Sequence, residues 1–385
     1  MKKERIYILD TTLRDGLQAP NTNPVNIKQR LEIGALLANM NVDIIEAGFA
    51  IGSKNDFDTI KGLASMGLDN TICSLARSMP ADIDAAGEAI KGARRGRIHT
   101  FISTSPIHMT AKLNMTPEEV LDNAVKGIKM ASKYTDDIQF SLEDYTRTEK
   151  DFAFRMVEAV INAGATTVNL PDTVGYTLPQ EFKRMVIELL HNVPNSDKAI
   201  FSTHCHNDLG LAVANSLAGV IGGARQIECT INGLGERAGN AAMEEIIMAY
   251  HVRGDRMLYK NNIITEKFKE ASDMLAKYTD APVQKNKAIV GINAFAHESG
   301  IHQHGVGKDA RTYEIMTPKS VGWGHTTISL GVTSGSDGLM QKSKELGYNL
   351  SKEDIKRIYP MFMQKAEKGR VSDDDFRAII ENVLI

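Results

Sequence analysis

The sequence has few cysteines and no long apolar run. Its three cysteines, Cys73, Cys205 and Cys229, lie far apart without CxxC spacing, a pattern that fits neither a disulfide framework nor a zinc-finger site. No apolar run approaches the roughly 20 residues that a membrane-spanning helix needs. The start, MKKERIYILD, passes directly from charged residues into a predicted strand, unlike a secretion signal. We therefore expect a cytoplasmic protein with reduced, buried thiols and no membrane partner.

An excess of charge of one sign is also missing. The formal net charge is -3 over 385 residues, and the densest basic cluster, KGARRGR at residues 91–97, contains no aromatic residue. Nucleic-acid-binding surfaces usually combine basic residues with aromatic side chains that stack on bases. With 42% hydrophobic and 24% charged residues, the composition is that of a globular protein. We expect no nucleic acid partner.

Short β-rich runs recur along the chain with helical patterns between them. The first helical pattern places Ile27, Leu31, Gly34, Ala35 and Ala38 on one apolar face. Such alternation predicts parallel β/α units. The eight runs are RIYILD, VDIIEAGF, NTICSLA, RIHTFIS, DIQFSLED, TTVNLPD, AIFSTHCH and QIECTING.

Eight β/α units match a (β/α)8 barrel, whose usual length is about 250 residues. A doubly wound open sheet is the competing arrangement. The polar clusters DTTLRDG, HCHND and NGLGERAGN follow the first, seventh and eighth runs. Only a closed barrel places the first strand beside the eighth and brings these clusters to one mouth, because an open sheet would scatter them. We predict fold class α/β, with a (β/α)8 TIM barrel over residues 1–265 that carries a metal site.

The alternation stops in the last third of the chain. Residues 292–331 are rich in loops and contain four of the ten histidines, and helical patterns follow near 335–347 and 351–367. We interpret residues 266–385 as a small, mainly helical C-terminal appendage. It would contribute to a catalytic site, either of its own chain or of a neighbouring subunit.

Two histidines, His204 and His206, are separated by one residue at the end of the seventh predicted strand. Alternate residues of a strand share a face, so both side chains would point into the barrel mouth. Two imidazoles there can share a divalent ion, with an oxygen ligand completing the site. The alternative is a pair of core histidines that bond to backbone carbonyls.

Two oxygen-bearing side chains lie at neighbouring strand ends. Asp15 follows the first strand within LRDG, and Asn240 follows the eighth within GERAGN. Taken singly, each could be a turn carboxylate or a helix cap. With His204 and His206 they form a set of two nitrogen and two oxygen donors that suits Mn²⁺, Zn²⁺ or Mg²⁺.

Arg14 lies beside Asp15, and its planar guanidinium is suited to binding a substrate carboxylate. The alternative role is a buried salt bridge with Glu46 or Glu143. His99, Glu143 and Thr173 are further polar residues at predicted strand ends. The glycines of NGLGERAGN do not form the GxGxxG fingerprint, so we predict no dinucleotide site.

Five motifs resemble those of the acyl-CoA-dependent, Claisen-condensing metalloenzymes of the isopropylmalate and homocitrate synthase family. They span about residues 5–370 in the family's order: LDTTLRDGLQAP, NLPDTVGYT, HCHNDLGLAVANS, NGLGERAGN and AFAHESGIHQHG. The resemblance implies a metal site, with Mn²⁺ as first candidate, bound by Asp15, His204, His206 and Asn240. It implies a 2-oxo acid site made by Arg14, His99, Glu143 and Thr173.

The resemblance also implies an acyltransferase and a homodimer. Acetyl-CoA would condense with a 2-oxo acid, most closely 3-methyl-2-oxobutanoate, in leucine biosynthesis. Arg14, Glu143 and His302 would be the catalytic residues, and His302 would assist proton transfer in the other subunit's site. A sibling synthase making homocitrate, citramalate or a methylthioalkylmalate, and a non-catalytic metal-binding homologue, are the alternatives. So is a 3-hydroxy-3-methylglutaryl-CoA lyase, although Cys229 lies inside a strand and not in the glycine-rich loop expected of the lyase's cysteine.

Three departures from the family's pattern stand out. The chain ends at Ile385, so we expect no leucine feedback through the C-terminal sensing domain usual in bacterial members. In EAGFAIGSKND, Ala50, Gly52 and Lys54 stand where Pro, Ser and Pro are expected. Lys54 would be either a solvated loop lysine or a partner for a second substrate carboxylate. In LGVTSGSDG, Ser336 and Asp337 replace Arg and His, a change that would affect acyl-CoA contacts or packing of the appendage.

Overall fold

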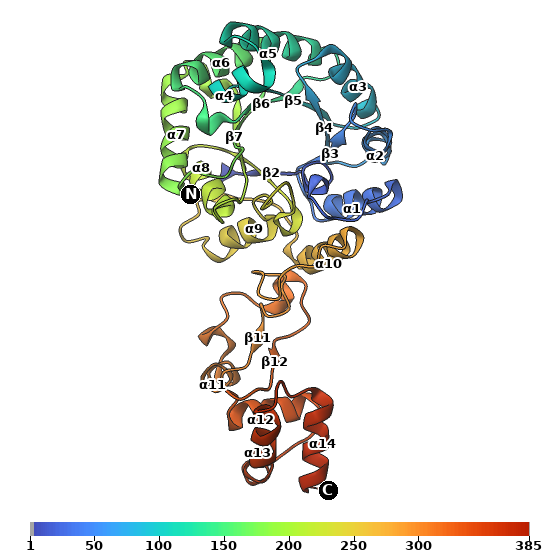
Figure 1. Ribbon diagram of the computed structural model, residues 1–385, viewed down its shortest axis with the longest axis vertical. Helices are drawn as coiled ribbons and strands as arrows, with labels where there is room; N and C mark the ends of the chain where they lie inside the picture. Colours follow the sequence, from blue (N-terminus) through green and yellow to red (C-terminus); the bar gives the residue numbers. More distant parts are fainter. Residues whose placement is uncertain (1–3, 385) are drawn as a thin grey trace. The chain divides into compact units, whose positions relative to one another are not determined.

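The computed structural model describes residues 4–384, and the chain divides into two compact units between Pro282 and Val283. Figure 1 shows the first unit as a ring of strands surrounded by helices. The division falls later than the predicted boundary at 265/266. The reason is that α10 (Phe268–Thr279) packs against α1 (Ile27–Asn39) and therefore belongs with the barrel.

The first unit is a closed barrel of eight parallel strands, with the last strand paired to the first. All eight predicted runs are strands of this barrel, so the predicted TIM barrel is confirmed. The strands are β2 (Tyr7–Asp10), β3 (Ile44–Phe49), β4 (Thr71–Arg77), β5 (Gly96–Ser103), β6 (Asp137–Glu143), β7 (Thr167–Asp172), β8 (Ile200–Cys205) and β9 (Gln226–Cys229). A short parallel pair, β1 (Glu4–Arg5) and β10 (Tyr259–Lys260), accompanies them.

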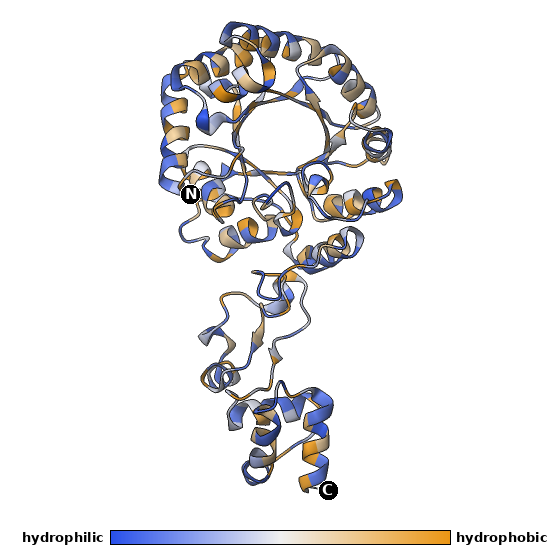
Figure 2. Ribbon diagram, in the orientation of Figure 1, coloured by the Kyte–Doolittle hydropathy of each residue, from blue (hydrophilic) through white to orange (hydrophobic). Residues whose placement is uncertain are grey.

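Helices cover the outside of the barrel, and their starts are marked by local capping. Asn26 and Gln29 form a capping box at the start of α1, as Thr116 and Glu119 do for a later helix. Figure 2 shows apolar and polar residues alternating along these helices. The others are α2 (Lys54–Ala64), α3 (Pro80–Ile90), α5 (Pro117–Ala131), α6 (Lys150–Ala163), α7 (Pro179–Asn192), α8 (Ala212–Gly222) and α9 (Met243–Val252). The short α4 (Pro106–His108) lies in the connection between β5 and α5.

The first predicted helix is present, but its buried face differs from the prediction. Of the five residues predicted to share the apolar face, only Gly34 is fully buried, while Ile33, Leu36 and Leu37 are buried beside it. Helix α1 contacts both α2 and α10. Because two neighbours cover it, its buried surface is wider and turned relative to the simple apolar stripe.

The second unit contains a two-stranded parallel pair, β11 (Ala296–His297) and β12 (Thr327–Ile328), and four helices among its described residues. The predicted helical patterns are confirmed as α12 (Ser336–Glu345) and α13 (Lys352–Ala366). Two helices were not predicted, α11 (Gly300–Lys308) and α14 (Asp373–Leu384). Buried Leu339, Ile358, Phe362 and Phe376 form the apolar core shared by α12, α13 and α14.

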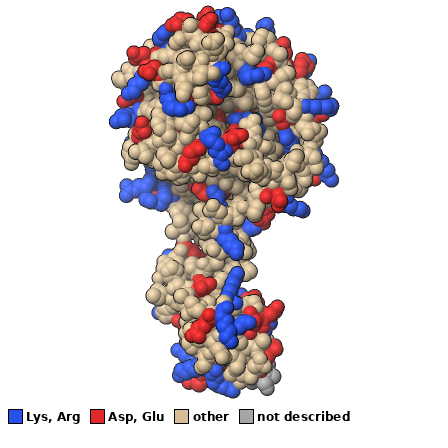
Figure 3. Space-filling view, in the orientation of Figure 1, with Lys and Arg blue, Asp and Glu red and all other residues tan. Residues whose placement is uncertain are grey.

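The mixed charges and the few, scattered cysteines of the sequence are reflected in the structure. No helix within residues 4–384 has the length and apolarity required to cross a bilayer. Figure 3 shows acidic and basic side chains interspersed on the face drawn. Cys73, Cys205 and Cys229 lie in strands β4, β8 and β9, and all three are buried and unpaired.

Candidate metal and substrate site

The barrel contains a cavity of about 290 Å³ whose lining includes most of the predicted site residues. Asn240 adjoins it through a hydrogen bond to Asp15. His302 lies in the second unit. The predicted residues that line the cavity are Arg14, Asp15, His99, Glu143, Thr173, His204 and His206.

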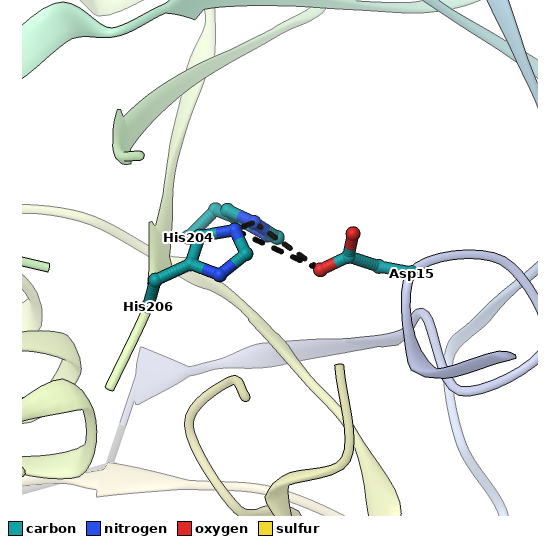
Figure 4. A group of neighbouring side chains, drawn as sticks. All are labelled: Asp15, His204 and His206. Atoms are coloured by element: carbon teal, nitrogen blue, oxygen red, sulfur yellow. Dashed lines mark hydrogen bonds and ion pairs between the residues drawn. The ribbon is translucent and has the colours of Figure 1, made fainter. Parts of the chain in front are cut away.

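Asp15, His204 and His206 converge in the barrel (Figure 4). The Nε2 atoms of the two histidines lie 3.1 Å apart, and each is 3.8 Å from Asp15 Oδ2. His204 belongs to β8, and His206 follows it in an isolated bridge with Asn240. Strand alternation therefore places both rings on one side, as the spacing predicted.

The donor set suits a divalent cation. The Asn240 Oδ1 atom is buried without a hydrogen-bond partner among the described residues, and such an atom is costly unless something binds it. The Asn240 amide donates to Asp15 Oδ2 at 2.6 Å, so rotation of this amide would present its oxygen to the same group. Two imidazoles, a carboxylate and an amide are ligands that Mn²⁺, Zn²⁺ and Mg²⁺ accept.

The electrostatics favour the metal-binding protonation states of Asp15 and His206, whereas burial would lower the pKa of His204 but Glu228 and Asp15 outweigh it and raise that pKa. Burial would raise the pKa of Asp15, but Arg14 and the two histidines outweigh it and lower that pKa. Burial and the neighbouring His204 lower the pKa of His206 to about 3. Asp15 is thus ionised and His206 neutral at physiological pH, which are the forms that bind a cation.

The glycine-rich loop after β9 allows Asn240 to approach this group. A Cβ atom at Gly235 would lie 2.1 Å from Asn240 Nδ2, and one at Gly239 would lie 2.0 Å from the Gly233 carbonyl oxygen. Gly239 also has a φ of 89°, a conformation that favours glycine. The glycines therefore serve close packing around Asn240.

Arg14 is fixed by two carboxylates. Its Nε donates to Glu46 Oε2 at 2.6 Å, and its Nη1 lies 2.9 Å from Asp15 Oδ1. Glu46 is fully buried and also contacts His99 Nδ1 at 2.5 Å. Burial would raise the pKa of Glu46, but Arg14 and His99 outweigh it and lower that pKa. The salt bridge considered as an alternative role for Arg14 thus exists with Glu46, and it orients the guanidinium that lines the cavity.

Glu143, the last residue of β6, and Thr173, which directly follows β7, line the cavity. Glu143 Oε1 lies 2.6 Å from the ammonium of Lys112, and the Ser103 hydroxyl donates to Oε2 at 2.5 Å. The Thr173 hydroxyl accepts a hydrogen bond from the Asp144 backbone amide at 3.0 Å. Both groups are therefore held in place by neighbouring residues.

An apolar part of the lining was not predicted from the sequence. Phe49, Leu75 and Phe101 line the cavity. A Cβ atom at Gly52 would lie 2.8 Å from the Phe49 ring, so the glycine found where serine is expected leaves space for this ring. Lys54 is 87% exposed and pairs with Asp58. It is a solvated lysine of α2 and is absent from the cavity lining.

Three further unpredicted residues of the lining, Ser141, Asn169 and Glu228, lie on the barrel strands β6, β7 and β9. Ser141 and Asn169 stand two and four residues before predicted residues, and Glu228 lies in the run that precedes the glycine-rich loop. Because every second residue of a barrel strand points into the barrel, this alternation could have indicated all three residues.

The second unit holds an exposed histidine beside an aromatic ring. The His302 ring stacks on Tyr313, with centroids 4.1 Å apart, and lies 6.2 Å from the His297 ring. In the altered segment, Ser336 begins α12 and the Asp337 carboxylate contacts Nδ1 of His304 in α11. The altered segment thus joins two helices inside this unit.

Comparison with known families assigns both units. The family described as HMGL-like matches residues 5–275, and the homocitrate synthase post-HMGL domain-like family matches residues 289–370. A hydroxymethylglutaryl-CoA lyase from Pseudomonas aeruginosa has a similar fold, with a TM-score of 0.61 at 18% identity over 72% of this chain and 94% of that chain.

Closer similarity is found to synthases. A 2-isopropylmalate synthase from Bradyrhizobium diazoefficiens is 52% identical over 99% of this chain and 74% of its own length. One from Nitrosomonas europaea is also 52% identical, over 99% of this chain and 75% of its own length. Identity of this extent across both units shows membership and not only a shared barrel. The chain belongs to the 2-isopropylmalate synthase family.

Proposed function

We propose that this chain condenses acetyl-CoA with 3-methyl-2-oxobutanoate to give 2-isopropylmalate and free CoA, a committed step of leucine biosynthesis. The observation that carries the substrate assignment is the two-sided cavity. Its polar side contains Arg14 and the Asp15–His204–His206 group, and its apolar side contains Phe49, Leu75 and Phe101. A branched aliphatic 2-oxo acid has this same division.

Asp15, His204, His206 and Asn240 would bind the divalent metal, for which Mn²⁺ is our first candidate. When bound, the metal supplies Lewis-acid polarisation of the substrate's carbonyl. Arg14 binds the substrate carboxylate through its guanidinium, oriented by Glu46 at 2.6 Å. His99 and Thr173 complete the 2-oxo acid site.

The reaction needs a proton removed from the acetyl-CoA methyl group and one delivered to the product. Glu143 and His302 are the groups that we assign to these transfers, since a carboxylate can accept a proton and an imidazole can accept or donate one. The methyl carbon then forms a bond to the carbonyl carbon of the 2-oxo acid. Water cleaves the thioester and releases the CoA thiol.

We further infer a cytoplasmic homodimer in which the partner subunit's His302 acts at the barrel site. His302 is exposed and presented beside Tyr313 on a short helix. Symmetric pairing would let each second unit serve the neighbouring barrel.

The alternatives fit less well. A dicarboxylic substrate of the homocitrate type needs a second cation, and Lys54, the candidate for it, pairs with Asp58 in solvent. The lyase would need a reactive thiol in the loop after β9, whereas Cys229 is buried within β9 and burial raises its pKa.

The test is thiol release from acetyl-CoA in the presence of Mn²⁺ and a panel of 2-oxo acids. We expect the highest kcat/KM with 3-methyl-2-oxobutanoate, a much lower value with 2-oxoglutarate, and no cleavage of 3-hydroxy-3-methylglutaryl-CoA. The absence of thiol release with 3-methyl-2-oxobutanoate would refute the proposed function.

A further inference from the structure

Gln139 on β6 lies at the centre of a buried hydrogen-bond network inside the barrel. Its side chain is fully buried. Its amide contacts Arg97 and Gln226 on the oxygen side and Glu228 and His99 on the nitrogen side. The network therefore reaches both the proposed metal site and the proposed 2-oxo acid site.

Arg97 fixes the direction of this amide. Gln139 Oε1 accepts from Arg97 Nη1 at 2.9 Å and from Gln226 Nε2 at 2.9 Å, while Gln226 Oε1 accepts from Arg97 at 2.8 Å. A guanidinium can only donate, and Arg97 is itself held by Asp137 at 2.8 Å. Both amide oxygens must face Arg97, so the Gln139 NH₂ group must face Glu228.

The orientation of the Gln139 amide in turn determines which ring nitrogen of His204 carries the proton. Gln139 Nε2 donates to Glu228 Oε1, and Glu228 Oε2 lies 3.0 Å from His204 Nδ1. An ionised carboxylate only accepts, so a hydrogen bond across this contact requires an N–H at His204 Nδ1. It would also give Glu228 Oε2, a buried atom, the hydrogen-bond partner that it otherwise lacks among the described residues. In the neutral ring, which is the form that binds a cation, Nε2 is then left with a lone pair, and this is the atom that faces His206 and Asp15.

The same NH₂ group also faces the other side of the cavity. It lies 3.3 Å from His99 Nε2, which is 2.6 Å from the Ser141 hydroxyl. With donors at Nε2, His99 carries its proton on Nδ1 and donates it to Glu46 at 2.5 Å. Glu46 then holds Arg14.

We infer that Glu228 and Gln139 are positioning residues that set the tautomer of His204 for metal binding. The inference rests on the metal site proposed above and adds residues that no motif of the sequence indicated. Carboxylate partners of this kind orient histidine ligands in many metal sites, and their loss weakens metal affinity or activity by about 10–100-fold.

The decisive variant is Glu228→Gln, which keeps the shape but adds an amide donor. That NH₂ group must face either the Gln139 NH₂ or His204 Nδ1, and the second arrangement moves the histidine proton to Nε2. We expect Mn²⁺ affinity, measured by isothermal titration calorimetry, to fall about 10–100-fold. The matched control is Ser202→Ala, which removes a hydrogen bond from Gln226 in the same network and should leave Mn²⁺ affinity unchanged.

The double variant Gln139→Glu with Glu228→Gln tests whether the donor-to-acceptor direction of these hydrogen bonds matters, and not merely the packing of the side chains. A carboxylate at position 139 accepts from the new amide at 228, whose oxygen again accepts from His204 Nδ1. Arg97 still has an acceptor at position 139. Mn²⁺ affinity should return to within a few fold of the wild-type value, a recovery that a purely structural role does not predict.

The outcomes separate this inference from the proposed metal site. If wild-type protein binds Mn²⁺ and His204→Ala does not, the metal site stands, and wild-type affinity in Glu228→Gln then overturns the inference. If wild-type protein does not bind Mn²⁺, the metal site itself fails. Should Glu228→Gln not fold, ¹⁵N NMR of histidine-labelled, metal-free wild-type protein decides, recorded at a pH high enough that the His204 ring is neutral. A tautomer with the proton on Nδ1 supports the inference, and one with the proton on Nε2 refutes it.

Discussion

The histidines that we assign to the site are held in opposite ways in the two units of the chain. In the barrel, His99 and His204 are 2% and 7% exposed, and each has a carboxylate at its Nδ1 atom. In the second unit, His302 is exposed and contacts an aromatic ring, and His304 pairs with Asp337 at the surface. The barrel histidines are thus pre-organised by their own chain. His302 and His304 lie at the surface of the second unit instead, and the predictions that follow compare the pre-organised barrel site with the role proposed for His302.

The largest loss of bound metal and of activity is expected from a change at His204, a histidine held in place by its own chain. His204→Ala removes one imidazole of the proposed metal group, so bound Mn²⁺ and nearly all condensation should be lost. Metal content of the purified protein and thiol release measure the two effects. His191→Ala, at an exposed histidine of α7, is the matched control. Stoichiometric metal and normal activity in His204→Ala would show that the barrel group is not the metal site.

The second unit is tested by mixing subunits. His302→Ala and His204→Ala should each be inactive as homodimers, since each lacks one part of the proposed site. Random exchange produces about half heterodimers with one intact site each, so thiol release should recover to roughly a quarter of the wild-type value. Heterodimers that demonstrably form and stay inactive would contradict the crossed site, and His302 would then act within its own chain.

A change at Arg14 tests whether the forked shape of the guanidinium, and not only its charge, matters in the barrel site. Arg14→Lys retains the charge but loses the fork that reaches both Glu46 and the proposed substrate carboxylate. Losing such a charged hydrogen bond costs about 1.5–3 kcal/mol, and kcat/KM should fall by about 10–100-fold. Arg155→Lys, at an exposed arginine that pairs with Glu118, should leave it unchanged. Wild-type kcat/KM in Arg14→Lys would remove this role.

Gly52 tests the apolar side of the cavity. Gly52→Ser introduces a Cβ atom that would lie 2.8 Å from the Phe49 ring, so the ring must move. We expect a several-fold higher KM for 3-methyl-2-oxobutanoate with a smaller change for acetyl-CoA. Equal changes in both KM values would indicate that Phe49 does not contact the 2-oxo acid.

The smallest effect is expected at Lys54. Its exposed ion pair with Asp58 is of a type worth about 0–1 kcal/mol. Lys54→Ala should leave 2-oxo acid preference unchanged and alter the free energy of unfolding by less than about 1 kcal/mol. A changed ratio of kcat/KM for 3-methyl-2-oxobutanoate over 2-oxoglutarate would place this lysine in the substrate site after all.

The barrel could be predicted because its strands are buried on both faces and appear as apolar runs with polar residues at their ends. Asp15, His204 and His206 could be placed together since strand closure brings their ends to one mouth. Helix α11 could not be predicted, because GIHQHGVGK contains three glycines, which disfavour helices. Buried Gln303 compensates by donating hydrogen bonds to the His297 and Ser329 carbonyls.

The residues around the predicted ligands were harder to identify. Glu228 and Gln139 lie within strand runs, and a polar residue there can serve the site or merely the barrel interior. Only the side-chain distances show that Glu228 reaches His204 Nδ1. Likewise, nothing in the sequence indicates that Phe49 lines the cavity. Its ring occupies space that is free because residue 52 is a glycine.

The three buried cysteines allow opening of the barrel to be followed by their reaction with thiol reagents. Cys73, Cys205 and Cys229 all lie in barrel strands, and burial raises the pKa of each thiol, so thiol reagents should be nearly silent toward the native barrel. The whole sequence contains no other cysteine. The appearance of reactive thiols over time therefore counts openings of the barrel alone, and unfolding confined to the second unit would leave the count at zero.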